Sequence, residues 1–241
     1  MNFDGMKCTI ASKMDISKYT SQDKILVAVD CILFGFDEKK MKALLIKRDF
    51  EPEKGKWSLM GGFVNKNENV DAAASRVLKE LTGLTDIYME QLFCFGNTKR
   101  DEAGRVISIS YFALIKIAEY GEQLTSNHEA KWFPIDTLPS LIFDHRLMVK
   151  KARERLQEKV SRHPIGFELL PNKFTLPQLQ NLYEDIFGTS FDKRNFTRKI
   201  LSLKVLKKLS QKEKTSSRKG AFYYVFDKKK YKNINQDLKF I

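Results

Sequence analysis

Residues 61–84 read GGFVNKNENVDAAASRVLKELTGL, and the fold of the chain is decided here. A helix is predicted to begin after Asn69, whose side chain is a favourable N-cap, and to end at Gly83, which tolerates the left-handed backbone that closes helices. Between these ends, apolar residues recur along one helical stripe: Val70, Ala74, Val77 and Leu81. The stretch therefore predicts a glycine-rich turn followed by a helix with one buried face.

The spacing of this stretch resembles the Nudix box. That motif asks for Gly, then Glu after five residues, then Arg-Glu-apolar-any-Glu-Glu-any-Gly-apolar. The matching positions are Gly62, Glu68, Arg76, Glu80, Gly83 and Leu84. Because several fixed positions coincide in one short segment, the match is specific.

Two carboxylates of the motif are missing, since Val77 and Leu81 stand where the family has glutamates and only Glu80 remains. Magnesium requires several hard oxygen ligands. One carboxylate cannot organise a pyrophosphate, its metals and an attacking water. We therefore expect no catalytic residue, no metal site and no cofactor, while a rearranged active site that still hydrolyses remains the alternative.

Length and composition bound the remaining possibilities. The 241 residues suggest one or two domains. Cys8, Cys31 and Cys94 show no paired spacing, which argues against a disulfide framework or a zinc site and fits a reducing cytoplasm. The most apolar run, 25–36, is short and contains Asp30, so no membrane span is expected.

Charge is distributed unevenly along the chain. Residues 161–241 contain 18 Lys and Arg against 7 Asp and Glu, whereas residues 1–160 contain 25 against 23. Nearly all of the net charge of +13 therefore lies in the last third. This asymmetry favours a near-neutral body joined to a module that meets a polyanion. A merely soluble basic tail is the alternative.

Three regions follow from the pattern. Residues 1–21 are polar and predicted to be disordered, and translation from Met1 or Met14 remains open. Residues 22–160 are predicted to form a Nudix-like domain, with strands at 25–34, 43–46, 88–95, 105–117 and 131–134, and a helix capped by Asp144 that runs to about Val160. His145, near that helix start, is interpreted as a local hydrogen-bonding or dimer-contact residue rather than a base.

Residues 161–241 are predicted to form a DNA-binding domain. A short strand is expected over 166–171, then a helix with Thr175 as N-cap and Pro177 in its first turn. A turn at 188–191 separates it from a second helix that starts at Asp192, and two strands at 204–209 and 221–226 flank a basic loop. Two helices with a short glycine-containing turn, followed by such a loop, are typical of a winged helix-turn-helix.

Candidate DNA contacts divide by chemistry. Arg194 and Asn195 have the side chains that read guanine and adenine edges. Phosphate contacts are assigned to the remaining basic and hydroxyl side chains of the second helix and the wing: Lys193, Arg198, Lys199, Ser216, Ser217, Arg218 and Lys219. A small basic domain that binds protein is the alternative for this region.

A degenerate Nudix domain followed by a winged helix resembles the Nudix-related transcriptional regulators of the NrtR type. The sequence is especially similar to the arabinose-responsive AraR branch in five short segments: 57–64, 80–84, 143–145, 164–167 and 192–196. The resemblance implies an α+β fold, with a Nudix-like mixed sheet sandwiched by helices and a C-terminal winged helix-turn-helix domain. It also implies a homodimer that binds double-stranded operator DNA and senses a small molecule.

The resemblance implies a pentose such as L-arabinose as effector, with ADP-ribose as the alternative. Candidate effector residues are those able to stack on a sugar or to pair with polar groups: Arg48, Trp57, Glu68, Arg76, Glu80 and Arg100. Structural roles compete with each of them, because Trp57 also suits a core and Arg76 with Glu80 also suits a helix ion pair. Two other functions stay open, an active Nudix pyrophosphatase with a basic appendage and an RNA-binding adaptor.

Overall fold

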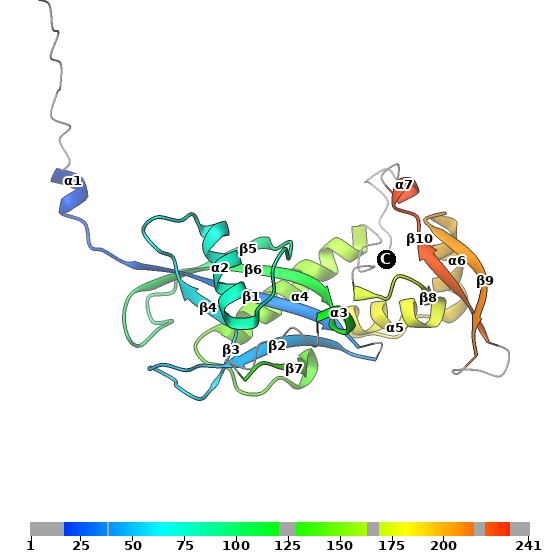
Figure 1. Ribbon diagram of the computed structural model, residues 1–241, viewed down its shortest axis with the longest axis horizontal. Coiled ribbons are helices and arrows are strands. Elements are labelled where there is room, and N and C mark those ends of the chain that lie inside the picture. The colour runs from blue at the N-terminus through cyan, green and yellow to red at the C-terminus, as the bar shows by residue number, and fades with distance from the viewer. Residues whose placement is uncertain (1–16, 38, 121–128, 163–168, 215–219, 232–241) are drawn as a thin grey trace, which may run out of the picture.

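The computed structural model describes residues 17–37, 39–120, 129–162, 169–214 and 220–231. Figure 1 shows two parts, a sheet domain and a smaller winged-helix domain, with the long helix α4 running from the first toward the second. α4 spans His145–Arg162. The expected α+β architecture is confirmed.

A mixed sheet forms the centre of the first domain. Its strands are β1 (Leu26–Phe36), β2 (Met41–Lys47), β3 (Trp57–Ser58), β4 (Met60–Phe63), β5 (Glu90–Phe95), β6 (Val106–Lys116) and β7 (Lys131–Pro134). The main order is β3-β2-β1-β6-β5, with β4 paired to β1 and β7 paired to β2. β1 and β6 run parallel along their whole length, whereas the other pairs are antiparallel. The sheet therefore brings residues of β4 and β6 to either side of β1.

Helices cover both faces of this sheet. α2 (Val70–Thr82) packs on one face, where Val29, Cys31 and Leu33 of β1 point. α4 packs on the other face, with Ile32 and Phe34. Period-two alternation along β1 explains this division. Shorter helices lie at α1 (Ser17–Thr20), α3 (Ile117–Tyr120) and the 3-10 turn Ile135–Thr137.

The winged-helix domain contains α5 (Leu176–Phe187), α6 (Lys193–Ser202), a terminal α7 (Lys228–Tyr231) and a three-stranded sheet. Its strands are β8 (Phe174–Thr175), β9 (Leu206–Glu213) and β10 (Ala221–Phe226), in the order β8-β10-β9. Thr175 and Gln178 form a capping box at the start of α5, and Gly188 closes it in the left-handed conformation. Both helix ends were readable from the sequence.

The two domains share one apolar core. Buried residues of β1, β2 and α4 continue into those of α5, α6 and β10. Polar contacts reinforce the junction, because Arg153 Nη2 of α4 donates to Asp185 O over 2.8 Å and Gln157 Nε2 donates to Ile186 O over 2.8 Å. The carboxylate of Asp185 accepts from Lys40 Nζ and from the backbone N–H of Met41, at the β1–β2 turn.

Three segments of the structure differ from the boundaries expected for them. The stretch 17–20 forms a single helical turn inside the segment 1–21 that is predicted to be disordered; residues 1–16 lie outside the described part. α4 continues to Arg162, two residues past the boundary expected after residue 160. The strand expected over 166–171 is absent at 169–171, where the backbone is irregular and the side chains of Leu169 and Leu170 are buried in the core. Residues 166–168 lie outside the described residues.

No helix in the described ranges combines the length and hydropathy that a membrane crossing requires.

Candidate functional site

A hydrogen-bonded turn leads into the second helix of the winged-helix domain. Glu184 Oε1 accepts from Phe191 N over 2.8 Å and from Gln180 Nε2 over 2.9 Å, while Gln180 also donates to Phe191 O. Asp192 then caps α6 by accepting from Asn195 N over 2.9 Å. Phe196 is buried against Tyr183, with ring centroids 5.5 Å apart. These contacts fix the angle between α5 and α6.

The outer face of α6 is basic and exposed. Five of the side chains expected to contact DNA lie there: Lys193, Arg194, Asn195, Arg198 and Lys199. Asn195 Oδ1 accepts from Arg198 Nη2 over 2.9 Å, so a bidentate contact of Asn195 with adenine requires this hydrogen bond to open. The helix has the position and the charge of a recognition helix.

The wing adds a second basic surface. Lys208 and Lys212 of β9 place their ammonium groups over the ring of Phe222, at 3.7 Å and 4.5 Å from its centroid. Such cation–π contacts hold a lysine in place without neutralising its charge. The four wing-tip candidates Ser216, Ser217, Arg218 and Lys219 lie outside the described residues.

In the box helix, the two departures from the enzyme motif are packing residues. Val77 is 2% exposed, and its Cγ2 atom lies 2.7 Å from where a Cβ on Gly62 would be. Leu81 packs against the same apolar cluster. In the described part of the chain, no group of three or more His, Cys, Asp or Glu is placed to hold a metal ion.

The charged residues that match the Nudix motif, Glu68, Arg76 and Glu80, pair with one another. Arg76 donates twice to Glu68, over 2.9 and 2.6 Å, once to Glu80 over 3.0 Å and once to Phe63 O over 2.9 Å. Hydrogen bonding from Arg76 lowers the pKa of Glu68 to about 2. Most donors of Arg76 are thus engaged within the protein. The ion-pair interpretation of Arg76 and Glu80 fits this geometry.

Arg48 and Trp57 lie at a different place, near an open cleft of about 440 Å³ lined by Glu53, Lys56, Trp57 and residues 140–143. The guanidinium of Arg48 lies 3.6 Å from the ring centroid of Phe50 and 5.4 Å from that of Phe143. Within the described residues, that guanidinium makes one hydrogen bond, from Nε to Phe50 O. Arg48 therefore retains donors for an anion.

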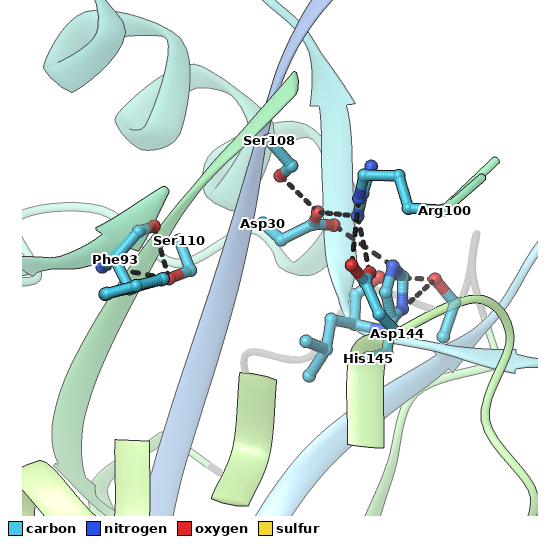
Figure 2. Close-up of polar contacts among 9 residues, drawn as sticks. Asp30, Phe93, Arg100, Ser108, Ser110, Asp144 and His145 are labelled. Carbon is cyan, nitrogen blue, oxygen red and sulfur yellow. Dashed lines mark hydrogen bonds and ion pairs between the residues drawn. The ribbon is translucent and has the colours of Figure 1, made fainter. Parts of the chain in front are cut away.

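Arg100 lies neither at the box helix nor at the open cleft, because it is buried beside Asp30 and Asp144. Its Nε and Nη2 donate to the two carboxylate oxygens of Asp144, over 3.0 and 2.7 Å, and Nη2 lies 3.7 Å from Asp30 Oδ2. Asp30 in turn accepts from Ser108 Oγ over 2.5 Å. Figure 2 shows these residues converging with His145 from β1, β6, the loop after β5 and the start of α4.

His145 completes this group as a neutral ring. Its Nδ1 accepts from the backbone N–H of Leu59 over 3.1 Å, which places the proton on Nε2, 3.5 Å from Asp30 Oδ1. Burial lowers the pKa of His145, although the neighbouring Asp30 and Asp144 oppose the shift. The expectation of a local hydrogen-bonding role is confirmed. We call Asp30, Arg100, Asp144 and His145 the buried charge cluster.

The six expected effector residues therefore separate into three places: the box helix, the open cleft and the buried charge cluster. Sequence reasoning missed Asp30 and Phe143 and treated Asp144 only as a helix cap. A carboxylate inside the otherwise apolar run of β1 was the available signal, since such a charge is kept only with partners.

Comparison with known proteins follows this division into two domains. Residues 24–155 match the NUDIX domain, and residues 166–226 match the NrtR DNA-binding winged helix domain. A similar protein is the ADPR responsive transcriptional repressor NtrR of Acinetobacter baylyi, 34% identical over 202 residues, which cover 82% of this chain and 81% of the relative.

Two further similarities bear on the separate domains. The chain is 38% identical over 144 residues to the ADP-ribose pyrophosphatase of Methanocaldococcus jannaschii, covering 58% of this chain and 80% of that enzyme. The crystal structure of Shewanella oneidensis NrtR complexed with a 27mer DNA superposes with a TM-score of 0.74 at 30% identity, covering 88% of this chain and 99% of that one.

Proposed function

We propose, because the chain belongs to the NrtR-type family of regulators that join a Nudix domain to a winged helix, that it is a transcriptional repressor. Its affinity for operator DNA is proposed to change when ADP-ribose binds. The observation that carries the proposal is similarity along both domains to an ADPR responsive repressor. The exposed basic face of α6 supports the DNA-binding half of it.

ADP-ribose replaces the pentose as the first candidate effector. The assignment to the arabinose-responsive branch and to sugar utilisation was based on sequence similarity in short segments. The two family models that match the chain and the reported relatives do not point to arabinose. The ADP-ribose alternative agrees with the name of the Acinetobacter relative and with the substrate named for the Methanocaldococcus enzyme.

Arg48 and the cleft beside Trp57 and Phe143 form the best-supported effector site. Arg48 offers unengaged donors to a diphosphate, and its guanidinium lies over the ring of Phe50 and near that of Phe143. The aromatic wall suits a sugar or an adenine face. Glu68, Arg76 and Glu80 are less suited, because their charges already pair with one another.

The DNA site is proposed to lie on α6 and the wing of each subunit of a homodimer. A two-fold dimer presents two recognition helices to successive major grooves, so the operator is expected to be a pseudo-palindrome. Arg194 and Asn195 are assigned to base edges, and the exposed lysines of α6 and β9 to phosphates.

The second candidate function is an active ADP-ribose pyrophosphatase, favoured by the identity to the Methanocaldococcus enzyme. Val77 and Leu81 argue against it, because aliphatic side chains that pack in or against an apolar cluster cannot ligate magnesium. Incubation of the protein with ADP-ribose and Mg²⁺ separates the two, with the Methanocaldococcus enzyme as a positive control. Turnover abolished by Glu80→Gln would establish hydrolysis.

The deciding experiment is a titration of the protein with the duplex upstream of its own operon, without effector, with ADP-ribose and with arabinose. Weakened binding with ADP-ribose alone supports the proposal. Weakened binding with arabinose alone restores the pentose, and a preference for single-stranded RNA over the duplex indicates an RNA-binding adaptor.

A further inference from the structure

We propose that the buried charge cluster consists of positioning residues that transmit effector binding to the winged helix. In this inference, which rests on the proposed function, Asp30, Arg100, Asp144 and His145 set the position of the α4 N-terminus according to the state of the β3–β4 segment. α4 then carries the change to α5 and α6.

The composition of the cluster is poorly explained by stability alone. Asp30, Arg100 and His145 are 3%, 8% and 3% exposed. Removing the charges of Asp30 and Arg100 from water carries a large desolvation cost, and well-packed apolar residues often stabilise as well or better. A buried charge that loses its partner is, however, strongly unfavourable, so the cluster tolerates only arrangements in which Asp30 and Arg100 stay paired.

One side of the cluster touches the segment that leads into the box helix. Asp30 faces Gly61 across β1 and β4, and a Cβ at Gly61 would lie 2.3 Å from Asp30 Oδ1, so the strands approach this closely only with glycine there. Leu59, two residues earlier, donates its N–H to His145. A shift of residues 59–62 therefore changes the contacts of both cluster members.

The backbone next to the cluster is strained at the proposed effector cleft. Phe143, whose ring lies near Arg48, has a φ of 46° although it carries a side chain. This left-handed conformation is unfavourable for a bulky residue and persists only where neighbours impose it. The residues that follow it directly are Asp144 and His145, both held by the cluster.

The other end of the transmission path reaches the DNA-binding domain. α4 has 18 residues, which corresponds to about 27 Å at the rise of an α-helix. Its Arg153 and Gln157 donate to the last carbonyls of α5, immediately before the turn that sets α6. A shift of α4 along its axis would be passed through these hydrogen bonds to the end of α5 and, through the turn that follows, to α6.

The test uses a matched pair of buried serines on β6. Ser108 Oγ donates to Asp30, whereas Ser110 Oγ, on the same face of the strand, donates to Phe93 O over 2.9 Å, away from the cluster. Both serines are fully buried, and Figure 2 shows both pairs. Ser108→Ala and Asp30→Asn are the test variants, and Ser110→Ala is the control.

Three quantities are measured for each variant: operator affinity alone, ADP-ribose affinity alone, and the factor by which ADP-ribose weakens operator binding. Coupling factors between linked sites are roughly 5- to 150-fold. We expect Asp30→Asn and Ser108→Ala to keep both separate affinities within about threefold while the coupling factor falls at least fivefold or to unity. Ser110→Ala is expected to keep the wild-type factor.

The outcomes distinguish the inference from its premise. Wild-type coupling retained in both test variants would overturn the positioning role alone. Loss of ADP-ribose binding itself would overturn it too, since the cluster would then belong to the pocket. If Asp30→Asn does not fold, Ser108→Ala decides. If ADP-ribose has no effect on the operator affinity of the wild-type protein, the proposed function is wrong, and the transmission role is wrong with it.

Discussion

The backbone N–H of Leu59 donates to Nδ1 of His145 over 3.1 Å, so this ring is held neutral with its second nitrogen directed at Asp30. The histidine thereby ties the segment before the box helix to the first turn of α4. Its protonation state bears directly on stability.

Stability is expected to fall in mildly acid solution because of this ring. Burial lowers the pKa of His145 in the folded protein. Well above a pH of about 6.5, the ring is neutral in both states and adds no penalty. As the pH falls below that value, the unfolded chain binds a proton that the folded protein resists, so the free energy of unfolding decreases.

Thermal unfolding of wild-type protein and of His145→Asn between pH 7.5 and 5.5 checks this. The asparagine is chosen because its side-chain oxygen can accept from Leu59 N in place of Nδ1, and the other two histidines are common to both proteins. The wild-type Tm should decline more steeply. Parallel declines would show that His145 does not control this dependence.

Val77→Ala should reduce the free energy of unfolding by roughly 2 kcal/mol, because it removes two buried methyl groups and leaves a cavity against Gly62. Lys79→Ala, exposed on the same helix, should change it by less than about 0.5 kcal/mol. Urea denaturation measures both. Equal small effects would contradict a packing role for Val77.

Arg48→Ala should weaken ADP-ribose binding roughly tenfold or more, because a charge-assisted hydrogen bond to a diphosphate is lost. Glu80→Gln should leave the affinity within about twofold, since Glu80 pairs with Arg76. Calorimetric titration of the protein without DNA gives both values. The reverse order would move the effector site to the box helix.

Arg194→Ala should weaken operator binding by ~1–3 kcal/mol and relax specificity at one base pair, as expected for a side chain at a base edge. Lys66→Ala, an exposed basic residue before the box helix, is the control for the loss of one charge. Binding to a panel of single-base operator variants is the measurement. An unchanged preference profile would remove Arg194 from direct readout.

Lys193→Ala should lower the slope of log affinity against log salt by about one unit, without a change in sequence preference, because one phosphate contact is lost. The same result is expected for Lys219→Ala in the wing. Fluorescence titrations at several salt concentrations provide the slopes. A change in base preference instead would assign the residue to base recognition.

The elements of the fold were accessible from sequence because their signals are local. Asn69 caps α2 through Ala72 N, and Gly83 closes it in the left-handed conformation, as the side-chain chemistry predicted. Thr175 and Gly188 mark α5 in the same way. The missing carboxylates and the basic recognition helix could likewise be read directly, since each depends on residue types within one helix.

Which charged residues pair was decided only by the tertiary structure. Arg76 and Arg100 look alike in the sequence, but the first binds neighbours on its own helix and turn, whereas the second binds Asp30 and Asp144 from distant segments. That pairing depends on the parallel register of β1 with β6 and on where α4 lies against the sheet. Such long-range contacts produce no recognisable residue spacing in the sequence. The paired groups come together only when folding buries them side by side, away from water.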